Sequence, residues 1–196
     1  MRSATPSALS SRVVVTVLLT LAVFGPAAFA AAEPGIHDGG MFFSEEALSE
    51  AADIVRVIRQ AYDRDVVVET YAAVPDELRE DLAREGKEKF YADWLERRAK
   101  ELGVRGVFVL ITREPGRVQV GVDRTTRQRV FTVKDREALR EALVSSFQNR
   151  QFDQGLLEGL RLVRRRMDLN TSRDRNPSVP VLAAASVSYA PAGIGR

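Results

Sequence analysis

Residues 107–112 read Val-Phe-Val-Leu-Ile-Thr, a run of β-branched and aromatic residues that predicts a buried strand. Residues 114–117, Glu-Pro-Gly-Arg, follow at once. They predict a tight turn, because proline presets one central dihedral angle and glycine accepts the positive one. In residues 118–122, Val-Gln-Val-Gly-Val, the valines alternate with other residues, so this strand has one buried face. The two strands therefore form a hairpin.

A second apolar strand is predicted upstream, at residues 66–71, Val-Val-Val-Glu-Thr-Tyr. Between it and the hairpin, a helical region begins near Asp76, bends around Gly86 and ends at Gly103, as a helix C-terminus commonly requires. This strand-helix-strand order predicts two parallel strands joined by a right-handed crossover.

Further helices flank this unit. Apolar residues recur at helical spacing in residues 44–62, 134–147 and 153–167, with Ser44 placed as an N-cap. Residues 129–133 predict a further short strand, and residues 33–40 read as a short leader. The predicted fold class is α/β: a single-domain α/β/α sandwich with a mixed sheet of about three or four strands covered by helices.

The first 32 residues carry the parts of a secretory signal peptide. Arginines precede an uncharged, mainly apolar run at residues 13–24, and a small-residue stretch then predicts cleavage near Ala30 or Ala32. The alternative is a retained N-terminal anchor, whose helix Gly25-Pro26 would break. The predicted localisation is export to the periplasm or cell envelope, with no transmembrane span after cleavage.

Composition narrows the function classes. The chain has 29 basic and 27 acidic residues, and removing residues 1–32 removes two arginines and no acid, so the mature chain is neutral. A strong bulk attraction to nucleic acid is therefore not implied. The chain has no cysteine, which excludes disulfides, a thiol nucleophile and a thiolate metal site.

Several local motifs, taken in order, resemble the TPM-domain family of exported bacterial and thylakoid-lumen proteins. Residues 38–40, Asp-Gly-Gly, and 43–46, Phe-Ser-Glu-Glu, are similar to the family's opening Asp, small residues and Leu-Ser-x-Glu. Residues 106–111, Gly-Val-Phe-Val-Leu-Ile, fit its "Gly-Val-Leu-Leu" strand, and residues 152–156, Phe-Asp-Gln-Gly-Leu, resemble the start of its last helix. The resemblance covers roughly residues 36–168.

Three segments are therefore predicted: a signal peptide at 1–32, a TPM-like domain at 33–168 and a tail at 169–196. The tail is predicted to be disordered because it loses all periodicity and is rich in Ala, Ser, Pro and Gly.

One loop departs from the family pattern. The family follows its third strand with Gly-Tyr-Gly-x-Glu and then an Asp before the next helix, whereas residues 120–127 here read Val-Gly-Val-Asp-Arg-Thr-Thr-Arg. Gly121 keeps the first glycine, Asp123 replaces the second, and Asp135 is the candidate for the later Asp. The match alone therefore does not carry the family's loop site over to this chain.

The resemblance implies two activities, because a plant-lumen member is described as an acid phosphatase and calcium binding is associated with the fold. Three carboxylates come from loops that this topology can bring to one end of the sheet, as catalytic groups or calcium ligands: Asp38, Asp123 and Asp135. Three cations are candidates for a phosphate clamp: Arg117, Arg124 and Arg127.

Each candidate also has a structural interpretation. Asp135 is placed as a helix cap, Asp123 as a turn former and Asp38 as a loop residue. The chain holds no Asp-x-Asp nucleophile motif, Walker loop or phosphatase histidine motif, and its one histidine, His37, cannot make a zinc site alone.

The predicted function is a non-catalytic envelope module that binds or assembles with an envelope or membrane-associated protein, with calcium as a candidate cofactor. The alternative is a metal-assisted phosphatase acting on phosphomonoesters. A third hypothesis gives partner recruitment to residues 179–196.

Overall fold

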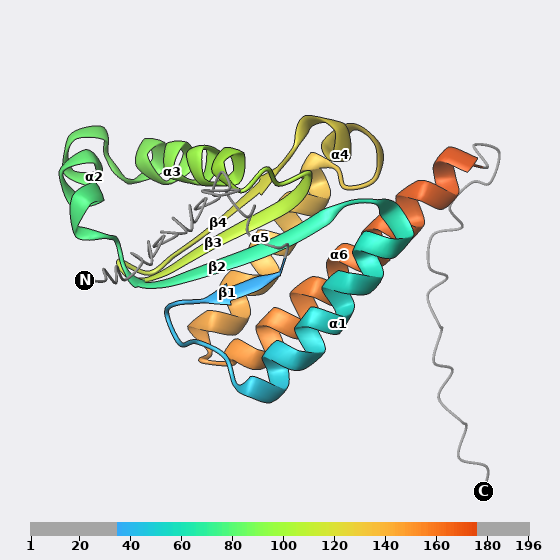
Figure 1. Cartoon of the computed structure of the whole chain (residues 1–196), viewed down its shortest axis with the longest axis horizontal. Helices are drawn as coiled ribbons and strands as arrows, with labels where there is room; N and C mark the ends of the chain where they lie inside the picture. Colours follow the sequence, from blue (N-terminus) through green and yellow to red (C-terminus); the bar gives the residue numbers. More distant parts are fainter. Residues whose placement is uncertain (1–34, 176–196) are drawn as a thin grey trace, which may run out of the picture. The chain divides into compact units, whose positions relative to one another are not determined.

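A four-stranded mixed sheet organises residues 35–175, the part of the chain that the computed structural model describes (Figure 1). Strands β1 (Ile36–Asp38), β2 (Asp65–Ala73), β3 (Gly106–Glu114) and β4 (Arg117–Val122) lie in chain order. The first three are parallel, and β4 pairs antiparallel with β3. The predicted signal peptide and residues 176–196 of the predicted tail lie outside the described residues.

The fourth strand is not where the sequence predicts it. Residues 129–133 were expected to be a strand, but they contain the end of helix α4 (Arg124–Arg129) and the start of helix α5 (Val133–Gln148). Phe131 between them is fully buried, so the apolar character of this segment reflects burial in a turn rather than pairing. The fourth strand is β1, in the segment expected to be a leader, where Ile36 pairs with Val68.

Helices cover both faces of the sheet, so the predicted α/β/α sandwich is confirmed (Figure 1). One face carries α1 (Glu45–Tyr62), α5 and α6 (Phe152–Arg175), packed on Val66, Val68 and Val109 of the sheet. The other face carries α3 (Lys87–Glu101), which packs Phe90, Tyr91 and Trp94 against Val67, Phe108 and Leu110. The alternation of side chains along β2 and β3 divides the core in this way.

Local chemistry explains the helix ends. The Ser44 hydroxyl accepts a hydrogen bond from the Ala47 N–H (3.2 Å), which confirms it as the N-cap of α1. The helical region after β2 comprises a short 3₁₀ turn, η1 (Asp76–Leu78), then α2 (Arg79–Glu85) and α3. Gly86, with φ of 78°, separates α2 from α3 and confirms the predicted bend.

The last helix is longer than predicted. It runs to Arg175, past the predicted domain boundary at residue 168. Asn170 explains the extension, because its side-chain amide donates to the Val130 carbonyl (3.1 Å) and to the Asp135 carboxylate (2.9 Å). A polar residue inside the predicted tail is therefore part of the packed domain. No helix within residues 35–175 is long and apolar enough to cross a membrane.

Candidate functional site at the carboxyl edge of the parallel strands

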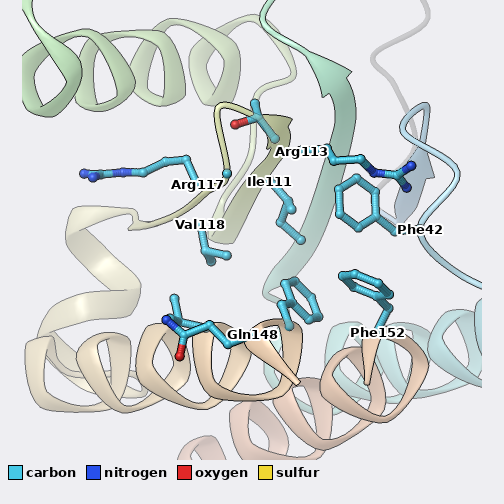
Figure 2. A pocket seen from close by; sticks show the side chains of 11 residues that line it. Phe42, Ile111, Arg113, Arg117, Val118, Gln148 and Phe152 are labelled. Atoms are coloured by element: carbon cyan, nitrogen blue, oxygen red, sulfur yellow. The ribbon is translucent and has the colours of Figure 1, made fainter. Parts of the chain in front are cut away.

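A pocket of about 300 Å³ lies where β1 and β3 end and β4 begins. Ligands of open α/β sheets bind outside the carboxyl ends of the strands, so this edge is where a site is expected. The lining comes from the loop after β1, the β3–β4 hairpin, α5 and the start of α6 (Figure 2). Its floor is apolar, with Ile111, Val118 and Val144, and its rim is polar.

Asp38 builds the loop that supplies one wall of this pocket. Its carboxylate accepts hydrogen bonds from the backbone N–H groups of Phe42 (2.9 and 3.0 Å) and Phe43 (2.9 Å) and from the Thr70 hydroxyl. Thr70 also accepts a hydrogen bond from the Gly40 N–H (2.9 Å). This network turns the chain back after β1 and aims the Phe42 ring into the pocket (Figure 2).

Three aromatic rings from distant segments meet at the pocket. Phe42 lies edge-on to Phe152 of α6, with ring centroids 5.4 Å apart, and Phe152 lies 5.4 Å from Phe147 of α5. Such ring pairs add about 0.5–1.5 kcal/mol each beyond their buried area. The pocket wall is therefore held by the packing of two helices and one loop.

Two arginines stand at the rim, and they differ in how their charge is balanced. The Arg113 guanidinium lies over the Phe42 ring, 4.5 Å from its centroid, and donates to the carbonyls of Gly40 (3.1 Å) and Met41 (3.2 Å). Arg117 instead makes a two-pronged pair with Glu88 (2.7 and 2.5 Å). No ion pair to Arg113 is found within residues 35–175, so its charge remains for a ligand.

The predicted carboxylates do not meet. Asp38 is in register with Thr70 and, through it, with Ile111. Asp123 lies at the other end of β3, where its N–H donates to the Gly106 carbonyl (3.0 Å). Five residues of strand separate these positions, about 16 Å at the usual rise per residue. Asp123 is the N-cap of α4 and accepts from the N–H groups of Thr125 (2.8 Å) and Thr126 (3.3 Å).

Asp135 belongs to a capping box at the start of α5. Its carboxylate accepts from the Thr132 hydroxyl (2.7 Å) and N–H (2.9 Å) and from the Asn170 amide, and Arg166 lies 3.4 Å away. Burial of the carboxyl raises its pKa, but these hydrogen bonds and Arg166 outweigh burial and hold the pKa below its usual value. The structural interpretation of Asp135 as a cap is thus observed.

The predicted phosphate clamp is also divided. Arg117 begins β4 beside the pocket, whereas Arg124 and Arg127 lie exposed on α4 at the other end of the sheet. Arg127 lines one cavity together with Asp123 and another together with Asp135. The three cations therefore do not converge on one anion.

The predicted calcium ligands do not form one coordination site in the described part of the chain. Within the described part of the chain, no group of three His, Asp or Glu side chains is placed to hold a metal ion. Both oxygens of Asp38 already accept backbone N–H bonds, and a cation would have to displace these donors. The predicted ligand set Asp38, Asp123 and Asp135 therefore does not fit one ion.

Sequence reasoning missed two features of the molecule. The first is the pair Phe42–Arg113, for which the only signal was an arginine ending an otherwise apolar strand. The second is Glu69, which is 3% exposed on β2 and is bound by Arg98 and Tyr71 on the α3 face. Its signal was a charged residue inside the predicted buried strand at 66–71.

Comparisons with known proteins show a shared fold. No family model matches the chain, and no curated protein matches it. The solved N-terminal domain of a protein from P. gingivalis is similar with a TM-score of 0.58 and 15% identity, over 73% of this chain and 87% of that one. The N-terminal domain of protein cg2496 from Corynebacterium glutamicum scores 0.48 at 11% identity, over 72% of this chain and 82% of that one. The first of these likenesses shows the fold alone.

Proposed function

We propose that this protein is a non-catalytic envelope module of the TPM type that binds a protein partner at the pocket beside Phe42. The partner segment carries an apolar side chain next to a carboxylate. Membership of the TPM family rests on the ordered motifs between residues 36 and 168, and export rests on the signal-like pattern of residues 1–32.

The observation that carries the proposal is the position of Arg113. Its guanidinium stands at the rim of an apolar pocket and has carbonyl partners but no carboxylate among residues 35–175. A partner that places an apolar side chain on the three phenylalanines and a carboxylate on Arg113 satisfies both parts of the site. The volume of about 300 Å³ is at the small end of ligand pockets and suits one anchoring side chain.

The alternative, a metal-assisted phosphatase, requires a nucleophile or metal-bound water beside several cations. The separation of Asp38 from Asp123, the loop hydrogen bonds of Asp38 and the capping roles of Asp123 and Asp135 support the binding module over this alternative. No specific contact in residues 35–175 favours the phosphatase, which stays a prediction.

The first experiment measures peptide binding. Fluorescein-labelled heptapeptides with a central Phe or Leu, flanked by either Asp or Lys, are titrated with the purified protein by fluorescence anisotropy. We expect the acidic peptides to bind at least tenfold more tightly than the basic ones, and Arg113→Gln to remove the difference. Arg124→Gln, an exposed arginine on α4, is the matched control and should retain it. Equal binding of both peptide classes contradicts the proposal.

The second experiment tests catalysis and calcium. The purified protein is assayed on a chromogenic phosphomonoester with and without calcium or magnesium. Turnover that disappears in both Asp38→Ala and Asp135→Ala, with folding preserved, would replace the binding module by the phosphatase. A melting temperature raised by calcium would support a cation site. An unchanged melting curve means that calcium should be dropped as a cofactor.

A further inference from the structure

Strand β4 forms the outer edge of the sheet, and its backbone hydrogen bonding can be assigned. The Asp123 N–H donates to the Gly106 carbonyl, and the register of β4 on β3 places these two residues directly opposite. Antiparallel strands alternate hydrogen-bonded and non-hydrogen-bonded pairs. The backbone groups of residues 117, 119 and 121 therefore point to β3, and those of Val118, Val120 and Val122 point outward.

These outward groups form an unpaired edge. No strand lies beyond β4 in the described sheet, and no hydrogen bond from another element within residues 35–175 reaches Val118, Val120 or Val122. Natural proteins usually blunt such an edge with proline, lysine or a bulge. Strand β4 contains neither proline nor lysine, and its register with β3 is continuous over six residue pairs.

The sheet is hollowed on its α3 side next to this edge. A groove of about 440 Å³ lies along residues 119–123, and Gly106 and Phe108 of β3 also line it. Its walls are Ala92, Glu96 and Ala99 of α3 on one side and Arg136 of α5 on the other. Figure 1 shows β4 at the margin of the sheet, with α3 on one face and α5 on the other. This hollow leaves room on the α3 side of residues 119–123 for side chains of an added strand.

The sequence of β4 is suited to antiparallel pairing with a second copy of itself. Residues 117–123 read Arg-Val-Gln-Val-Gly-Val-Asp. When a second copy is turned end for end about Val120, valine faces valine at each outward position and Gln119 faces Gly121. Arg117, which is paired with Glu88 in its own copy, then faces Asp123 of the other copy at both ends, on the α3 side of the sheet. Within one copy, Asp123 Oδ2 is buried and makes no hydrogen bond among the described residues.

We propose that two copies of this chain pair through β4, antiparallel about a two-fold axis at Val120, and so join their four-stranded sheets into one. The strand that pairs with β4 is that of a second copy, because Arg117 and Asp123 at its two ends have opposite charges and valines lie at equal distances on either side of Val120. An isologous contact of this kind closes on itself and does not propagate into fibres. The pairing shares Arg117 and Val118 with the pocket beside Phe42, so its tests measure the oligomeric state and not peptide binding.

The first test is the oligomeric state. Sedimentation velocity of the full-length protein at concentrations up to about 100 µM should show a reversible dimer. Arg117→Glu places glutamate opposite Asp123 at both ends and should raise the dissociation constant at least about tenfold. Adding Asp123→Asn, which keeps a good N-cap residue for α4, should recover part of the affinity.

The control variant is Arg56→Glu, which also breaks an exposed ion pair, with Asp53 on α1, and should leave the dimer unchanged. Circular dichroism and the melting temperature establish that each variant is folded. A protein that is monomeric at every concentration overturns the proposal. So does a dimer whose dissociation constant is the same in Arg117→Glu.

The second test reports the register and does not depend on charge. Because the chain has no cysteine, Gln119→Cys creates a single reactive site close to the proposed axis. A short bis-maleimide should join two copies of this variant and should fail with Ser49→Cys, an exposed position on α1. Equal crosslinking at both positions, or none at residue 119, overturns the pairing.

Discussion

Arg98 makes a bidentate ion pair with the carboxylate of Glu69 on the α3 face of the sheet. Arg98 Nε lies 2.9 Å from Glu69 Oε2, and Arg98 Nη2 lies 2.8 Å from Oε1. The Tyr71 hydroxyl donates to the same carboxylate at 2.9 Å. Glu69 is 3% exposed, so its charge is tolerated in the core only because these donors replace water.

Removing the Arg98 side chain should therefore leave the buried Glu69 carboxylate without its ion-pair partner. We expect Arg98→Met to lower the free energy of unfolding by about 3–5 kcal/mol, the usual cost of breaking a buried ion pair from one side. Arg97→Met, on the exposed side of the same helix, should change it by less than about 0.5 kcal/mol. Urea unfolding followed by circular dichroism measures both. Equal effects would mean that Glu69 is hydrated.

The same cluster predicts an alkaline transition. Burial, and then the charge and hydrogen bond of Glu69, raise the pKa of Tyr71 to about 12. A raised pKa means that the folded state holds this proton more tightly, so its contribution to stability is full below pH 10 and is lost as the pH rises towards 12. The unfolding midpoint should fall over this range, and less steeply in Tyr71→Phe. Parallel curves for the two proteins would contradict the shift.

The hydrogen bonds of Asp38 predict that substituting this residue destabilises the fold. Asp38→Ala leaves the N–H groups of Phe42 and Phe43 without their carboxylate acceptor, and should cost about 3 kcal/mol of unfolding free energy. Asp38→Asn keeps one acceptor oxygen and should cost less. Asp53→Ala, which removes an exposed carboxylate on α1, should be nearly neutral. A fully stable Asp38→Ala protein would show that the loop does not need this cap, and would release Asp38 for another role.

Much of the fold was readable from the sequence because its signals are local. The antiparallel pairing of β3 and β4 confirms the hairpin predicted from residues 107–122. The positive φ of Gly86 confirms the predicted bend. Strand β1 was missed because its burial depends on pairing with β2, which no local pattern records. The segment around Phe131 was misread because one buried ring in a turn resembles one buried position of a strand.

The candidate site was harder to read than the fold. Loop order predicts that Asp38, Asp123 and Asp135 converge, but this fails because Asp38 ends the parallel strand β1 and Asp123 follows the antiparallel strand β4. The chain therefore leaves these two strands at opposite ends of the sheet. Arg113 gained its role from a contact with Phe42, 71 residues earlier in the chain, which only the tertiary structure brings about.

Asp135 predicts how the protein responds to acid. Burial raises the pKa of its carboxyl, but Thr132, Asn170 and Arg166 together lower it by more than burial raises it. The net pKa therefore lies below the ordinary 3.8. A lowered pKa means that the contribution to stability is present above pH 3.8 and is lost as the pH falls through the folded value. We therefore expect the urea midpoint to fall below about pH 4, beyond any general acid effect, and to fall less in Asp135→Asn.

At neutral pH the asparagine variant should cost about 1 kcal/mol, because it keeps one acceptor for Thr132 but loses the charge that Arg166 faces. Asp76→Asn, an exposed acid of η1, is the matched control and should follow the unmodified protein at every pH. If the Asp135→Asn and Asp76→Asn proteins have the same acid dependence, the capping box does not hold the carboxylate charged. The lowered pKa of Asp135 would then have to be abandoned.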